Sequence, residues 1–129
     1  MSYVLDTSAW SDALRGGRTG RKLASTAVSR VLLAAPVLYE LRRGAVRAAN
    51  AKALRQAIDD IRLVHAVAPF DEAAALEAVR IAAAQAAKGR QIHHLDTMIA
   101  GIAASVNATL VTRDKDFKGI AGLQIEDWS

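Results

Sequence analysis

Residues 3–8 read YVLDTS, three β-prone residues followed at once by an acid and two hydroxyl residues. The apolar run predicts a short buried strand, and Asp6 with the two hydroxyls predicts the start of a helix. The same order returns at residues 31–34, where Pro36 lies in the first turn of the following helix. Strands that alternate with helices predict a mostly parallel central sheet with helices on both faces.

The rest of the chain supplies the other elements of such a sheet. Apolar or alternating runs predict about five strands, at residues 3–5, 31–34, 64–67, 109–112 and 123–126. Helical patterns lie between them, at residues 8–14, 18–29, 36–44, 45–62, 71–89 and 96–106. In the helix that Asp71 opens, the apolar side chains expected on the buried face are Ala75, Leu76, Val79, Ala82, Ala83 and Ala86. The predicted fold class is therefore α/β.

Composition restricts the function. The 129 residues, 52% of them hydrophobic, suit one compact domain. Seventeen Lys and Arg against thirteen Asp and Glu give a net charge of +4, which favours a polyanionic partner such as nucleic acid. The lack of cysteine excludes thiolate metal sites, so a metal would be bound by oxygen or imidazole. No apolar run approaches the ~20 residues that cross a bilayer, and we expect a cytoplasmic protein without a membrane partner.

Acidic residues stand where a parallel sheet binds its ligands. Asp6 follows the first strand, Asp114 and Asp116 follow the strand at 109–112, and Glu40 lies one turn into the helix after the second strand. Ligands bind at the carboxyl ends of the strands in an open parallel sheet. Asp96 begins a helix that leads into the fourth strand. Each of these acids is also an ordinary cap, turn or first-turn residue, so only their convergence would indicate a site.

Carboxylates that converge on one site would need a bound proton or a bound cation. Clustered negative charges repel each other, so one of them would take up a proton unless a cation were bound. Carboxylates and water are suitable ligands for Mg²⁺ or Mn²⁺, and such ions hold a phosphate oxygen while they activate a water molecule. The acidic positions therefore favour a divalent metal site suited to phosphate chemistry.

Four segments stand in order along the chain: VLDTS at 4–8, ELRRG at 40–44, DTMIA at 96–100 and LVTRDKDF at 110–117. Together they resemble PIN-domain proteins of the VapC toxin family, and the resemblance covers residues 1–129 as one PIN-like domain. It implies a toxin of a toxin–antitoxin system, a metal-dependent endoribonuclease that hydrolyses RNA phosphodiester bonds. It also implies Mg²⁺ or Mn²⁺ as cofactor, a small VapB-like antitoxin as inhibitor, and a homodimer.

The resemblance also implies the site residues. It implies an acidic metal-binding quartet of Asp6, Glu40, Asp96 and Asp114, with Asp116 as a further catalytic acid beside them. The hydroxyl positions that match the family beside the metal are Thr7, Ser8 and Thr112. Family members often carry Asn at the position of Asp114 and the acid a few residues later, so either Asp114 or Asp116 is the fourth site acid.

Other residues allow two interpretations. Arg42 and Arg43 lie near Glu40 and are expected to contact RNA phosphates, although a solvated basic face explains them equally well. Trp10 is either a core residue or a hydrophobic contact for a partner.

The histidine pair at 93–94 fits surface structure better than a metal site, so neither histidine is assigned to the site. The alternative function is a non-catalytic nucleic-acid-binding or regulatory module of the same fold, which would not depend on Asp6.

Overall fold

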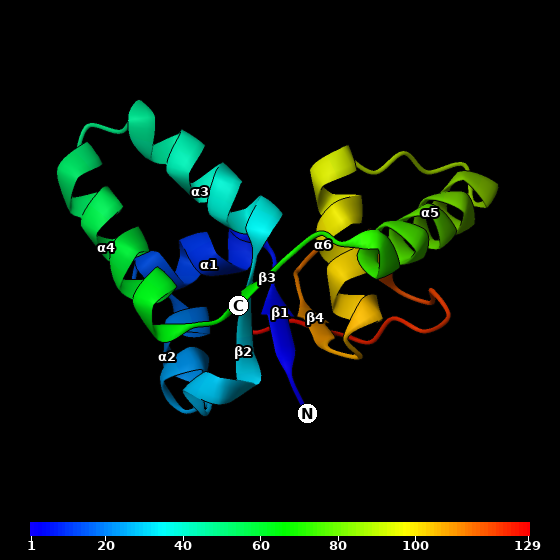
Figure 1. The fold of residues 1–129 in the computed structure, drawn as a ribbon, viewed down its shortest axis with the longest axis horizontal. Coiled ribbons are helices and arrows are strands. Elements are labelled where there is room, and N and C mark those ends of the chain that lie inside the picture. The colour runs from blue at the N-terminus through cyan, green and yellow to red at the C-terminus, as the bar shows by residue number, and fades with distance from the viewer.

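The computed structural model describes residues 1–129 as a five-stranded sheet between two groups of helices (Figure 1). The strands are β1 (Tyr3–Leu5), β2 (Val31–Ala34), β3 (Val67–Ala68), β4 (Thr109–Val111) and β5 (Ile125–Glu126). The α-helices are α1 (Thr7–Leu14), α2 (Arg18–Ala24), α3 (Ala35–Val46), α4 (Ala51–Val64), α5 (Glu72–Ala87) and α6 (His94–Ser105), with short 3₁₀ helices η1 (Val28–Arg30) and η2 (Lys115–Phe117). Every neighbouring pair is parallel, which confirms the predicted α/β class.

The order of the strands determines where a ligand site belongs. The sheet runs β3-β2-β1-β4-β5, so the chain steps in one direction from β1 to β3 and then returns past β1 to form β4. Crossovers between parallel strands are right-handed, so the helices of the returning step cover the opposite face. In Figure 1, α1 to α4 lie on one side of the sheet, and α5 and α6 lie on the other. The switch point between β1 and β4 is where open α/β sheets bind ligands.

The central strands are rich in apolar residues because they lie in the core. Both β1 and β4 are buried along their whole length, because helices cover both faces of the sheet. Trp10 of α1 is also fully buried, and its ring meets the edge of the His65 ring at a centroid distance of 5.3 Å. Trp10 is therefore a core residue, and its interpretation as a partner contact is wrong.

Several predicted boundaries are wrong. Helix α3 does not end at Gly44 but continues to Val46, since Gly44 keeps a helical backbone with open space around its α-carbon. The strand predicted at 64–67 is displaced, because α4 continues to Val64 and β3 begins only at Val67. The single helix predicted at 18–29 is two elements, α2 and η1.

The other errors concern α6 and the edge strand. Helix α6 begins at His94 and is capped by His93, so Asp96 lies inside its first turn. The helix ends at Ser105. The strand predicted at 123–126 is only β5, two residues long.

The buried face predicted for α5 is also wrong. The helix turns Ala74, Ala78, Ile81 and Gln85 inward and leaves Leu76 and Val79 exposed by 67% and 68%. The reason is close packing against α6, where a Cβ added to Gly101 would lie 2.6 Å from the Ala74 carbonyl oxygen. The part of α5 that carries Ala74 and Ala78 therefore faces Gly101 of α6.

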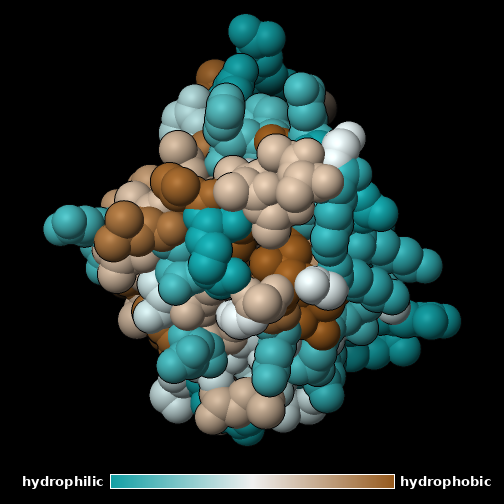
Figure 2. All heavy atoms as spheres, turned by 90° about the vertical axis from the view of Figure 1, so that its right-hand side faces the viewer, coloured by the Kyte–Doolittle hydropathy of each residue, from teal (hydrophilic) through white to brown (hydrophobic).

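This packing leaves apolar side chains on the surface. Figure 2 views the side of the molecule that carries α5 and α6, and it shows apolar side chains gathered in a band among polar ones. Even so, none of the helices is long and apolar enough to cross a membrane.

Candidate active site

An acidic cleft of about 380 Å³ opens at the carboxyl ends of β1 and β4, at the switch point of the sheet. Three acids from different elements line it: Asp6 after β1, Asp96 in the first turn of α6, and Asp114 in the loop after β4. The other lining residues are Thr7, Ser8, Ile99, Leu110, Arg113 and Phe117. The fold thus brings together three of the five acids that the sequence singled out.

Asp6 is fixed by the start of α1. Its Oδ1 accepts hydrogen bonds from the Ala9 amide at 2.8 Å and from the Ser8 hydroxyl at 2.9 Å, so Asp6 caps the helix. Its own amide donates to the Val111 carbonyl of β4 at 3.0 Å. One carboxylate oxygen is therefore used to hold the residue, and the other accepts no hydrogen bond from the chain. Ser8 supports the site by holding Asp6.

Asp114, another residue that lines the cleft, is fixed in a similar way by the start of η2. Its amide donates to the Thr112 hydroxyl at 3.0 Å, and its Oδ1 accepts from the Asp116 amide at 2.9 Å. Thr112 itself is buried. Asp114 thereby caps the 3₁₀ helix η2, and its second oxygen accepts no hydrogen bond from the chain.

Asp116 lies outside the acidic cleft. Its carboxylate forms an ion pair with Arg90 at 2.9 Å, and its carbonyl oxygen accepts a hydrogen bond from the buried side chain of Gln85. These contacts hold Asp116 against the end of α5. Of the two acids left open by the sequence, Asp114 faces the cleft and Asp116 does not.

Glu40 lies beside the cleft rather than in it. Its Oε1 accepts a hydrogen bond from the Thr7 hydroxyl, and both residues line a neighbouring hollow between α1 and α3. Thr7 belongs to both cavities and therefore connects Glu40 to the acidic cleft.

The acids influence one another through their charges. Partial burial raises the pKa of Asp96 above its ordinary value of 3.8. The negative charges of Glu40, Asp6 and Asp114 raise this pKa further, against an opposing effect of His93. Four of the predicted acids, Asp6, Glu40, Asp96 and Asp114, are therefore close enough to repel one another. The repulsion disfavours the ionised form of Asp96.

This raised pKa predicts a pH-dependent stability. Above pH 3.8 the folded protein retains the Asp96 proton longer than the unfolded chain, so the free energy of unfolding falls as pH rises through this window. The loss is complete once Asp96 is ionised in the folded protein as well. We expect Asp96→Asn to raise the Tm of the metal-free protein at pH 7, because the amide removes a partly buried charge that its acidic neighbours repel. Thermal melts in EDTA check this, and the gain should shrink toward pH 4. An equal gain at both pH values would contradict this origin.

The side chains of the cleft fit a divalent ion that keeps part of its water shell. No three acidic or histidine side chains lie close enough together to bind one ion directly. The donor chemistry nevertheless fits Mg²⁺, which keeps several waters and often takes only one or two protein carboxylates. The free oxygens of Asp6 and Asp114 and the repulsion felt by Asp96 are consistent with such a water-rich site.

Of the two arginines predicted to contact RNA phosphates, Arg42 is paired within the protein and Arg43 is not. Arg42 forms an ion pair with Asp59 of α4 at 2.7 Å, which ties α3 to α4. Arg43 forms no ion pair and lines a groove with Glu40 and Arg47. His93 caps α6 through its Nδ1, which agrees with the surface role expected for it.

Arg113 lines the cleft and was missed by the sequence reasoning. It directly follows β4 and stands between Thr112 and Asp114. The rule that singled out the acids, a position at the carboxyl end of a strand, applies to Arg113 equally well. Its position therefore carries the same signal in the sequence as the positions of the acids.

The fold and the site together define an α/β protein whose acidic side chains meet at a topological switch point. The PIN domain family model matches residues 3–123. The chain therefore belongs to the PIN domain family, and the resemblance seen in its motifs is confirmed.

Particular relatives lie within the VapC group. The chain is 32% identical over 101 residues to the tRNA(fMet)-specific endonuclease VapC of Salmonella typhimurium, covering 78% of this chain and 76% of that protein. It is 41% identical over 64 residues to the protein of the same name from Shigella flexneri, a match that spans 49% of this chain and only 48% of the relative. The solved structure of DNA-bound VapBC from Salmonella typhimurium contains a similar chain, with a TM-score of 0.87, 27% identity and coverage of 100% and 99%.

Proposed function

We propose that this protein is a VapC-type toxin, a metal-dependent endoribonuclease that hydrolyses RNA phosphodiester bonds in the acidic cleft. The observation that carries the proposal is the meeting of Asp6, Asp96 and Asp114 in one cleft. Support also comes from the relatives, two of which are named tRNA(fMet)-specific endonucleases. With RNA as substrate, the protein acts in the cytoplasm.

In this proposal Asp6, Asp96 and Asp114 would hold Mg²⁺ or Mn²⁺ partly through bound water molecules. Glu40 would support the site by accepting the hydrogen bond from Thr7. The bound ion supplies Lewis-acid stabilisation of phosphate charge and a more acidic water. The protein positions the acidic side chains. Ser8 and the start of α1 hold Asp6, and Thr112 holds the loop that carries Asp114.

The proposal is tested by incubating the purified, partner-free protein with total cellular RNA in Mg²⁺, Mn²⁺ or EDTA. We expect discrete fragments that require the metal. Thermal melts provide a second readout, because a ligand present at 100 times its Kd stabilises the fold by about 2.7 kcal/mol. Absence of metal-dependent fragments would contradict the nuclease and favour the non-catalytic module.

The position of the fourth acid gives a sharper prediction. We expect Asp114→Asn to lower the cleavage rate by about 10²-fold or more, because removal of a metal ligand forfeits part of the several kcal/mol that the ion contributes. Asp116→Asn should keep most of the activity, since Asp116 faces Arg90 outside the cleft. Single-turnover cleavage of a mapped RNA fragment measures both variants. The reverse order of activities would assign the site role to Asp116.

The partners follow from the same comparison. The similar structure from Salmonella typhimurium is a VapBC complex, and we infer a VapB-like antitoxin that inhibits this protein by covering the cleft. We also infer a homodimer, which the exposed Leu76 and Val79 on α5 support, since exposed apolar patches often form interfaces.

A further inference from the structure

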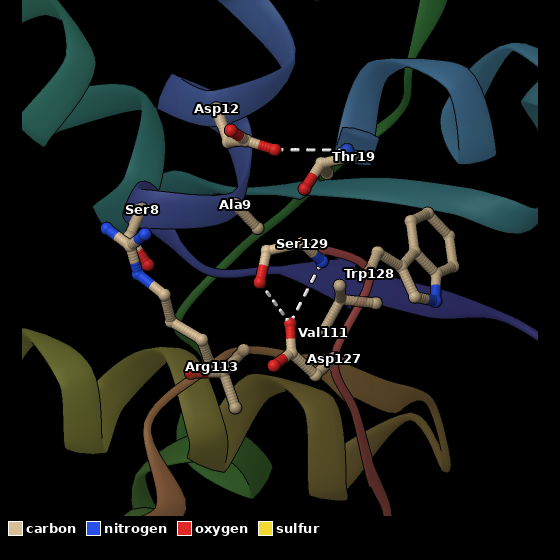
Figure 3. A pocket seen from close by; sticks show the side chains of 10 residues that line it. Ser8, Ala9, Asp12, Thr19, Val111, Arg113, Asp127, Trp128 and Ser129 are labelled. Carbon is tan, nitrogen blue, oxygen red and sulfur yellow. Dashed lines mark hydrogen bonds between the residues drawn. The ribbon is translucent and has the colours of Figure 1, made fainter. Parts of the chain in front are cut away.

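Arg113 is the only basic residue that lines the acidic cleft. It also borders the small hollow drawn in Figure 3 and the groove beyond the loop after β4. In Figure 3 its side chain extends from the end of β4 toward Ser8 at the start of α1. Arg113 therefore lies where three surface depressions meet, beside the side chains that hold Asp6 and Asp114.

The guanidinium of Arg113 is free despite its acidic surroundings. The side chain is exposed, it takes part in none of the three ion pairs of the structure, and it forms no hydrogen bond. Arginine has five N–H donors in a planar fork, so all five remain available to a ligand.

On the other side of Arg113 lie Asp12 and Asp127, whose pKa values its positive charge helps to lower, although neither carboxylate forms an ion pair with it. Asp12 accepts a hydrogen bond from the Thr19 amide at 3.0 Å. Asp127 accepts hydrogen bonds from the amide and hydroxyl of Ser129 at 2.9 and 2.6 Å (Figure 3). Both carboxylates are thus satisfied by local donors, and a purely structural ion pair does not account for Arg113.

We propose that Arg113 is the phosphate-binding side chain of the cleft and contacts the RNA backbone at or next to the scissile phosphate. This inference rests on the proposed function and adds a residue to it. Acidic side chains alone repel a polyanionic strand, so the cleft needs a cation from the chain as well as its metal. A planar fork matches two phosphate oxygens at once, which orients the strand as well as attracting it.

The loop after β4 is built to present this side chain. The hydrogen bond from the Asp114 amide to Thr112 closes a turn around Arg113, and the Asp114 cap fixes the start of η2 on the other side. Thr112 is buried, which anchors the turn in the body of the protein. The backbone of Arg113 is therefore held rigidly between two fixed neighbours, while its side chain is free to reach the substrate.

The test separates RNA binding from cleavage. Binding of a single-stranded oligoribonucleotide is followed by fluorescence anisotropy in EDTA at several salt concentrations, in an Asp96→Asn background. One lost phosphate contact on a single strand lowers the log–log salt slope by about 0.7, which corresponds to about fourfold weaker binding at 0.15 M salt. We expect Arg113→Gln to show both changes, and Arg113→Lys to restore the slope because it keeps the charge.

The matched control is Arg55→Gln, which removes the same charge from an exposed position on α4 that forms no ion pair. Arg113→Gln with the affinity and slope of Arg55→Gln would overturn the proposal. A lowered Tm in Arg113→Gln without rescue of the slope by lysine would also overturn it, since it would assign a structural role.

Cleavage by otherwise wild-type protein adds an independent readout. We expect Arg113→Gln to lower kcat/KM while the metal requirement stays unchanged. If the wild-type protein cleaves no RNA, the nuclease proposal fails, but the binding measurement still decides the role of Arg113. If the protein cleaves RNA and binding ignores Arg113, the nuclease stands and this inference fails.

Discussion

Asp6→Asn is expected to lower the rate of RNA cleavage by about 10³-fold while the protein stays folded. Metal ions contribute several kcal/mol of charge stabilisation to phosphate chemistry, and about 4 kcal/mol corresponds to 10³-fold in rate. Asp6 has one oxygen that accepts no hydrogen bond from the chain, and it lines the cleft directly after β1. An amide in its place keeps the shape of the site but loses the negative charge that binds a cation.

Asparagine is the informative replacement because Asp6 has a second role. Its Oδ1 caps α1 through the Ala9 amide, and asparagine caps helices about as well as aspartate. Replacement by alanine would lose this cap, which contributes about 1 kcal/mol, and would mix a stability loss with the chemical effect. The charge change also removes one of the repulsions that raise the pKa of Asp96.

The measurement is RNA cleavage in Mg²⁺ beside a thermal melt of each variant. Asp60→Asn is the control, since Asp60 is exposed on α4 and its carboxylate contacts only Gln56. Full activity in Asp6→Asn would remove the basis of the metal site. Equal loss of activity in Asp60→Asn would show that overall charge, and not the cleft, controls the rate.

The sequence predicted the parts of this site that depend on local rules. The strand that ends at Leu5 and the cap at Asp6 are neighbours in the chain, so a few residues determine both. The parallel order of the strands then brings the ends of β1 and β4 together, as the sheet rule predicts. The fold class and the candidate cleft follow from these two steps.

The choice between Asp114 and Asp116 depends on distant residues. Asp116 is held by Arg90 and Gln85, which lie 26 and 31 positions away at the end of α5. No local pattern reports these contacts. Glu40 is a similar case, because its hydrogen bond to Thr7 joins residues 33 positions apart.

Hydrophobic periodicity predicted the wrong buried face for α5. The short distance between α5 and α6 places small residues of α5 at the contact, rather than its most hydrophobic ones. Periodicity assigned Leu76 and Val79 to the core, whereas the helix buries Ala74 and Ala78 against Gly101 of α6. The absence of a side chain at Gly101 allows the two helices to approach closely, and this approach needs small residues on both sides.

This interpretation predicts opposite effects for the same substitution in two helices. A Cβ at Gly101 would lie 2.6 Å from the Ala74 carbonyl oxygen and 2.8 Å from the Ala78 Cβ, so Gly101→Ala must push α5 away from α6. Overpacking of this kind costs about 1–3 kcal/mol, and the larger side chain of Gly101→Val should cost about 3 kcal/mol or more. A loss of 3 kcal/mol is a large share of the roughly 5–15 kcal/mol that stabilises a domain, and it lowers the Tm by about 10 °C.

Gly44→Ala is the matched control, because Gly44 also lies inside a helix but has no atom within 4 Å of its added Cβ. Alanine is a better helix former than glycine by about 0.5–1 kcal/mol, so helix propensity alone predicts that both alanine variants are stabilised. Close packing predicts that Gly44→Ala is stabilised and Gly101→Ala is destabilised. Chemical denaturation of the two variants measures the sign directly, and stabilisation of both would mean that α5 and α6 pack less closely than the structure requires.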